Sequence, residues 1–236
     1  MLDEILPAIA ITIIIFMLLA IVIIIRLSTP VDRPIAESSY LEIVKQCKTG
    51  DLFVASYETP HAFIVKAFTQ SVWNHIGMVY KEKIAFNYQD PYSLYIIECC
   101  AYDKIYRHVV KMPLGYWIRF SCDLNLAWLK LEGSTLDQEA VDKQFELSSD
   151  GRFNKRISNW IPAVMKLAYK PKTDKTFYCS EYISYLYQEL GIMKKELRPA
   201  CYSPKSFMTG QLPFINGFSL AKPVMFKVPC QMISFD

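Results

Sequence analysis

Residues 5–25 form an unbroken apolar run, ILPAIAITIIIFMLLAIVIII, that carries no charged side chain. As an α-helix this run would be about 31 Å long, which matches the hydrocarbon core of a bilayer. The run therefore divides the chain into three parts. Residues 1–28 are a predicted transmembrane anchor, residues 29–48 a linker with a short lead-in helix, and residues 49–236 one folded domain with a full hydrophobic core.

The charges that flank the run favour an anchor over a secretory signal peptide. Asp3 and Glu4 precede it and Arg26 follows it at once. A signal peptide has basic residues before a shorter apolar core and small residues at a cleavage site after it. We expect an uncleaved anchor in the lipid bilayer, with a signal peptide as the alternative. The positive-inside rule then places the domain on the cytoplasmic side of a membrane, or inside a virion if the protein is viral.

The seven cysteines indicate a reducing compartment. They are odd in number and irregular in spacing, and they include no CxxC pair. This pattern argues against a disulfide framework and against the common zinc motifs, so neither a metal nor a cofactor is predicted. The net charge of +3 comes without a basic cluster interleaved with aromatic residues. Nucleic acid is therefore not an expected partner.

The domain is predicted to have a strand-rich first half and a helix-rich second half, an α+β arrangement. Strands are predicted over residues 52–54, 71–80, 84–88, 92–100, 107–112 and 224–228, and short helices over 38–47 and 61–70. Residues 125–149 are predicted to be irregular or helical, and residues 151–169 show helical spacing.

The stretch 177–191, FYCSEYISYLYQELG, predicts an amphipathic helix with Cys179 in its first turn. Gly191 is the predicted stop. A thiol at a helix N-terminus lies beside unpaired backbone N–H groups and the positive end of the helix dipole, which favours the thiolate. The same N–H groups suit an oxyanion. The tyrosines of this stretch are interpreted as packing residues, with an apolar acyl site as the alternative.

A nucleophilic thiol needs a base, and the chain has only His61, His75 and His108. His75 begins a predicted strand, and Gly77 leaves space on the same face for a neighbouring side chain. A histidine at a strand start and a cysteine at a helix start suit a Cys–His pair. The alternative is a histidine that lies in the core or on the surface without a catalytic role.

Glu98 is the one charged residue in the predicted strand 92–100, and period-two counting puts it on the face of Leu94 and Ile96. A buried carboxylate needs a partner. Two interpretations stay open. Glu98 orients an imidazole as the third member of a catalytic triad, or it forms a salt bridge with a lysine or arginine.

Four blocks in this order resemble the circularly permuted branch of the NlpC-like papain-fold cysteine hydrolases. They are GDLFV (50–54), SVWNHIGMV (71–79), YIIEC (95–99) and FYCSEYISYLYQELG (177–191). The resemblance is to the YiiX-like proteins, including members from large DNA viruses, and it covers residues 50–206. It implies a permuted papain-like domain with an antiparallel sheet and helices. It also implies a catalytic triad of Cys179, His75 and Glu98.

The resemblance has limits that shape the expected function. Residues 121–175 match no block, and the predicted anchor lies outside the shared core. The related lecithin:retinol acyltransferase branch has an NCEHF-like block where this chain reads YCSEY, so that branch is disfavoured. We expect a membrane-anchored hydrolase or acyltransferase that cleaves an amide, ester or thioester bond in an acyl- or peptide-type substrate. The alternative is a catalytically inert, membrane-tethered structural or interaction protein, for instance in a virion membrane.

Overall fold

The computed structural model describes residues 36–37, 39–82, 93–101, 108–121, 124–154 and 174–228. The predicted anchor, the predicted strand 84–88 and residues 155–169 of the predicted helical segment lie outside these ranges. None of the helices within them has the length and hydropathy that crossing a bilayer requires.

The largest sheet has seven strands in the order β1-β11-β6-β2-β3-β4-β5. Their bounds are β1 Ala36–Glu37, β2 Leu52–Ser56, β3 His75–Lys81, β4 Leu94–Cys99, β5 Val109–Pro113, β6 Asn125–Leu129 and β11 Val224–Phe226. All neighbours pair antiparallel except β1 and β11, which are parallel. Two short ladders join β7 (Leu131–Glu132) to β10 (Ser219–Leu220) and β8 (Arg152–Phe153) to β9 (Thr176–Phe177).

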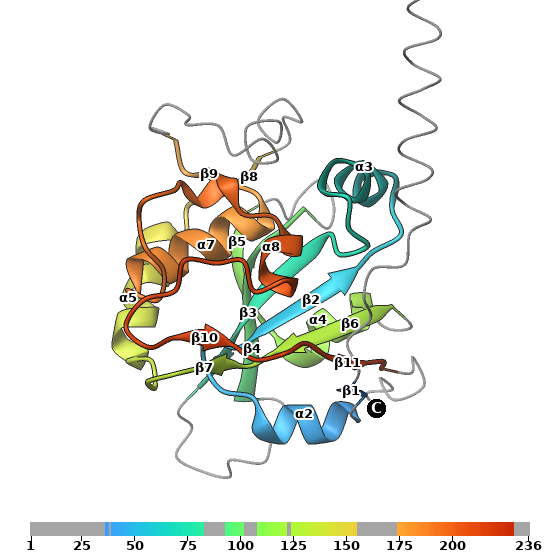
Figure 1. The fold of residues 1–236 in the computed structure, drawn as a ribbon, viewed down its shortest axis with the longest axis horizontal. Helices are drawn as coiled ribbons and strands as arrows, with labels where there is room; N and C mark the ends of the chain where they lie inside the picture. Colours follow the sequence, from blue (N-terminus) through green and yellow to red (C-terminus); the bar gives the residue numbers. More distant parts are fainter. Residues whose placement is uncertain are drawn as a thin grey trace, which may run out of the picture.

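Helices pack against both faces of this sheet, as expected for a mixed α+β domain. The helices are α2 Tyr40–Gln46, α3 Pro60–Thr69, α4 Leu114–Ser121, α5 Gln138–Ser148, α7 Cys179–Glu189, η3 Pro199–Cys201 and α8 Pro204–Met208. One apolar cluster joins a sheet face to α7, α5 and α8, and a second joins the other face to α2 and α4. In Figure 1 the orange α7 lies above the central strands and the blue α2 below them.

The predicted α+β class is confirmed, but the prediction of an irregular or helical segment is wrong at residues 125–129. They form β6, which pairs with β2 on one side and β11 on the other. Its sequence NLAWL lacks the apolar–polar alternation of a half-exposed strand because four of its five residues are buried. The predicted strand 71–80 begins only at His75, since residues 71–74 form a turn. Helix α4 was not predicted.

A buried aspartate fixes the start of β2 against the strands beside it. Asp51 is fully buried and accepts hydrogen bonds from the backbone N–H groups of Lys48 (3.2 Å) and Leu131 (2.9 Å) and from the Trp128 indole (3.0 Å). Burial raises the pKa of Asp51 to about 6 in spite of these donors. The turn before it needs Gly50, whose φ is +97°.

Candidate active site

Helix α7 begins at Cys179, as the sequence predicts. Glu181 accepts a hydrogen bond from the Tyr178 backbone N–H (3.1 Å) and so satisfies one donor at the helix start. The helix is more buried than its predicted single apolar face, because Ser180, Glu181, Ser184 and Gln188 are also buried. Their burial follows from the position of α7 between the sheet, α5 and η3.

The first turn of α7 offers donors beside the thiol. Among the described residues, the backbone N–H groups of Cys179 and Ser180 have no acceptor. Such groups precede the first intrahelical bonds and lie at the positive end of the helix dipole. They are therefore available to an oxyanion that forms next to the Cys179 sulfur.

The tyrosines of α7 pack into the core, which agrees with their interpretation as packing residues. Tyr182 and Tyr187 are fully buried. The Tyr182 hydroxyl lies 3.0 Å from the Ser148 Oγ, and the Tyr187 hydroxyl donates to the Gly50 carbonyl at 2.6 Å. These bonds attach α7 to α5 and to the start of β2, and so fix the position of Cys179.

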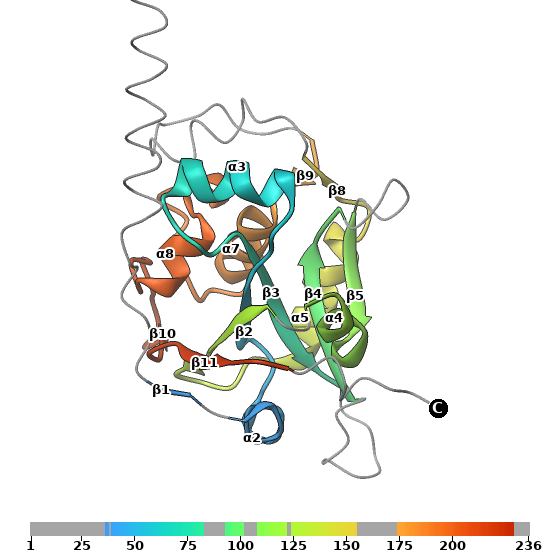
Figure 2. The same ribbon diagram turned by 90° about the vertical axis from the view of Figure 1, so that its right-hand side faces the viewer.

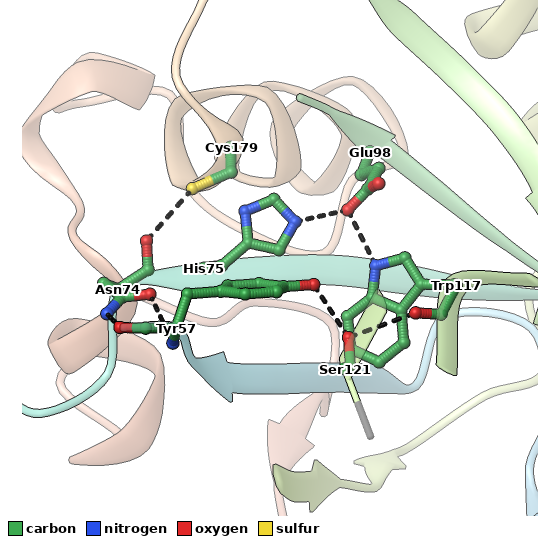
Figure 3. A network of polar contacts seen from close by, with 7 residues as sticks. All are labelled: Tyr57, Asn74, His75, Glu98, Trp117, Ser121 and Cys179. Atoms are coloured by element: carbon green, nitrogen blue, oxygen red, sulfur yellow. Dashed lines mark hydrogen bonds and ion pairs between the residues drawn. The ribbon is translucent and has the colours of Figure 1, made fainter. Parts of the chain in front are cut away.

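The structure brings Cys179, His75 and Glu98 together (Figure 3). The His75 Nε2 lies 2.5 Å from the Glu98 Oε2, and the Cys179 side chain is close enough to the same imidazole to raise its pKa. The second ring nitrogen of His75 is on the Cys179 side in Figure 3. Glu98 therefore has the imidazole partner of the first interpretation. The His75 side chain is 12% exposed and that of Glu98 is fully buried.

Gly77 allows the imidazole and the carboxylate to meet across two strands. Met78 pairs with Ile97, so the next pair along β3 and β4 puts Gly77 beside Glu98. A Cβ on Gly77 would lie 3.5 Å from the Glu98 Oε2 and only 2.4 Å from the Ile96 Cγ2. The space that the sequence predicted at this glycine is thus confirmed. His75 reaches Glu98 diagonally over it, on the face that carries Ile96.

The charges around His75 raise the pKa of its imidazole. Burial lowers the pKa of the imidazole, but the Glu98 charge and then the hydrogen bond and charge of Cys179 raise it, from 6.5 to about 10. The direction of this shift favours the protonated form of the imidazole. A cationic imidazole beside a cysteine is the arrangement that favours a thiolate nucleophile.

Two aromatic residues that the sequence did not single out enclose the imidazole. The Trp117 ring of α4 is nearly parallel to that of His75 (24°, centroids 6.4 Å apart), and the Tyr57 ring meets it edge-on (71°, 5.3 Å). The Trp117 Nε1 donates to the Glu98 Oε2 at 3.0 Å. The helical spacing of buried Leu114, Trp117 and Ile118 was the available signal for α4.

Asn74 closes the segment between β2 and β3 that contains α3, and it places its own backbone carbonyl next to the Cys179 thiol. Its side chain accepts from the Tyr57 backbone N–H (3.0 Å) and donates to the Tyr57 carbonyl (2.9 Å). Its own carbonyl lies 3.8 Å from the Cys179 Sγ. Figure 2 shows α3 at the edge of the domain, connected to β2 and β3. The Asn74 side chain thus joins the two ends of this segment and fixes the start of β3.

Within the described ranges, no group of three or more histidine, cysteine, aspartate or glutamate side chains is arranged to hold a metal ion. The five cysteines in these ranges, Cys47, Cys99, Cys100, Cys179 and Cys201, are all buried. Cys122 and Cys230 lie outside them.

Comparisons with known proteins give little to set beside this geometry. No family model matches the chain. No curated protein matches it either. A solved structure to which it is similar is that of the metalloprotein YiiX from Escherichia coli O157:H7. The two share 20% identity over 61% of this chain and 67% of the other, with a TM-score of 0.36.

Proposed function

We propose that the protein is a thiol hydrolase or acyltransferase in which Cys179 is the nucleophile, His75 the acid–base and Glu98 the residue that orients His75. In this proposal the domain is a circularly permuted NlpC-like papain fold, in which the histidine precedes the cysteine along the chain. Residues 5–25 anchor it in a membrane, with the domain on the cytoplasmic side or within a virion.

One observation carries the proposal. A buried carboxylate is 2.5 Å from one nitrogen of an imidazole whose other side meets a thiol at a helix N-terminus. A buried charge is costly without a partner, so a structural role alone would be served by a simpler apolar pair. A carboxylate that fixes the imidazole ring and stabilises its protonated form supports nucleophilic catalysis by the facing sulfur.

The proposed reaction has two steps. The Cys179 thiolate attacks a carbonyl carbon, and the N–H groups of Cys179 and Ser180 stabilise the oxyanion. The carbon–leaving group bond then breaks, and the leaving group takes its proton from the His75 imidazolium. In the second step the neutral His75 removes a proton from water, the hydroxide adds to the thioester carbon, and the Cys179 thiolate departs. With an alcohol or amine in place of water, the same steps transfer the acyl group.

The substrate class follows from the chemistry and from the predicted anchor. A thiolate with an oxyanion site acts on amides, esters and thioesters alike. An anchor that holds the domain near a bilayer favours a lipid-linked or membrane-proximal acyl substrate over a freely diffusing one. Peptidoglycan is disfavoured for a domain on the cytoplasmic side.

The test is acylation of the full chain by p-nitrophenyl acetate and p-nitrophenyl decanoate, followed by mass spectrometry of the modified peptides. We expect an acyl adduct on Cys179 that decays by hydrolysis and that is absent in Cys179→Ala. His75→Ala should slow its formation by about a hundredfold or more, since general acid–base catalysis contributes at least that much. Faster turnover of the decanoate would support a lipid-linked substrate.

Cys201→Ala is the matched control, because Cys201 and Cys179 are similarly buried, at 6% and 8% exposure. It should leave acylation of Cys179 unchanged. Equal acylation of Cys179 and Cys201, with no dependence on His75, would refute the enzyme and favour the inert membrane-tethered protein.

A further inference from the structure

The Glu98 carboxylate has a second partner besides His75. Its Oε2 atom accepts from the His75 Nε2 at 2.5 Å and from the Trp117 Nε1 at 3.0 Å. Trp117 is fully buried, and an indole N–H can only donate. The carboxylate oxygen that faces the imidazole is therefore also the oxygen that the indole holds.

The helix that carries Trp117 is itself attached to the surroundings of His75. The Ser121 hydroxyl donates to the Trp117 carbonyl at 3.1 Å, and the Tyr57 hydroxyl lies 2.7 Å from the same Ser121 oxygen. Because the Ser121 proton is used on the carbonyl, Tyr57 is the donor to Ser121. The imidazole thus contacts the rings of Trp117 and Tyr57, and these two residues are joined through Ser121 (Figure 3).

We propose that Trp117 is a positioning residue which holds the Glu98 carboxylate, through its indole N–H, in the orientation that directs it at His75. The proposal rests on the proposed function of the Cys179–His75–Glu98 site. The indole N–H of Trp117 donates to Glu98 and not to the thiol, so Trp117 acts through Glu98. Without the indole donor, the buried carboxylate is less stabilised as an anion and can rotate about its side-chain bonds.

The chain provides a matched control at Trp128. Its Nε1 donates to the Asp51 Oδ2, also at 3.0 Å, and the Trp128 side chain belongs to the same apolar cluster as Trp117. Trp128→Phe removes the same kind of bond, an indole N–H to a buried carboxylate, at a site that does not include His75. Any effect of lost packing or lost stability should be common to both variants.

The experiment is a pH titration of the full chain labelled with ¹³C-histidine and observed by NMR. Only three histidines are present, and His61→Gln and His108→Gln assign the His75 signal. The titratable groups that face His75 are Glu98, Cys179 and the phenol of Tyr57, and its pKa responds most to Glu98 and Cys179. Trp117→Phe should lower the pKa of His75 by about one pH unit or more. It should also slow alkylation of Cys179 by iodoacetamide at neutral pH, while Trp128→Phe should change neither.

An unchanged His75 pKa in Trp117→Phe, or an equal change in Trp128→Phe, would overturn the proposal. If Trp117→Phe does not fold, β-(3-benzothienyl)alanine at position 117 keeps the ring shape and removes only the N–H donor. The two proposals fail separately. Loss of selective Cys179 acylation in the parent protein counts against the enzyme. If removal of the indole N–H leaves the His75 pKa unchanged while Cys179 is still selectively acylated, only the proposed role of Trp117 is refuted.

Discussion

Replacement of Asp51 by asparagine should abolish a specific pH dependence of stability. Asp51 is fully buried, and burial raises its pKa from 3.8 to about 6 against hydrogen bonds from Leu131, Lys48 and Trp128. Between these two pH values the folded chain holds a proton that the unfolded chain has released. The free energy of unfolding must therefore fall as the pH rises through this window, and the contribution is lost above it.

The size of the effect follows from the difference of about two pH units. At about 1.36 kcal/mol per unit, ionisation of Asp51 costs the folded state about 3 kcal/mol between pH 4 and pH 7. The free energy of unfolding of a typical domain is only about 5–15 kcal/mol in total, so this loss is readily measured. An asparagine side chain does not titrate in this range, and the variant should lack this part of the slope.

The assay is urea unfolding of the full chain, followed by tryptophan fluorescence at several pH values from about 4 to 8. The difference between the parent and Asp51→Asn removes the titration of the other carboxylates. Asp150→Asn is the control, because Asp150 is exposed and pairs with Lys175. It should leave the slope close to that of the parent. If the profiles of the parent and of Asp51→Asn run parallel from pH 4 to pH 7, the raised pKa of Asp51 is wrong.

Three further changes test the site and its supports. Glu98→Gln removes the charge that most raises the pKa of His75, so that pKa should fall well below its value in the parent; an unchanged NMR titration would contradict the pairing. Gly77→Ala puts a Cβ 2.4 Å from the Ile96 Cγ2 and should destabilise the fold by about 1–3 kcal/mol in urea unfolding, whereas no loss would mean that the strands shift freely. Tyr187→Phe loses a buried 2.6 Å hydrogen bond and should cost about 1 kcal/mol in the same assay; a neutral result would show that α7 is held by packing alone.

Local patterns along the chain predicted the elements that carry the chemistry. Helical spacing and a terminal glycine located α7 with Cys179 in its first turn, and period-two counting put Glu98 on the face of Leu94 and Ile96. These predictions succeeded because helix caps and strand faces depend on residues a few positions apart. The same patterns failed at residues 125–129, where a strand buried on both faces shows no alternation.

The assembly of the site depends on contacts that no local pattern encodes. His75 meets Glu98 because β3 and β4 pair in a register that puts Gly77 between them. Trp117 reaches Glu98 from 19 positions away, and the Asn74 carbonyl lies beside a thiol 105 positions further along. Strand register and helix packing fix these distances because they are settled by burial of the whole core. The sequence by itself thus determines the residue types and their order, whereas only the tertiary structure determines which group each buried charge is paired with.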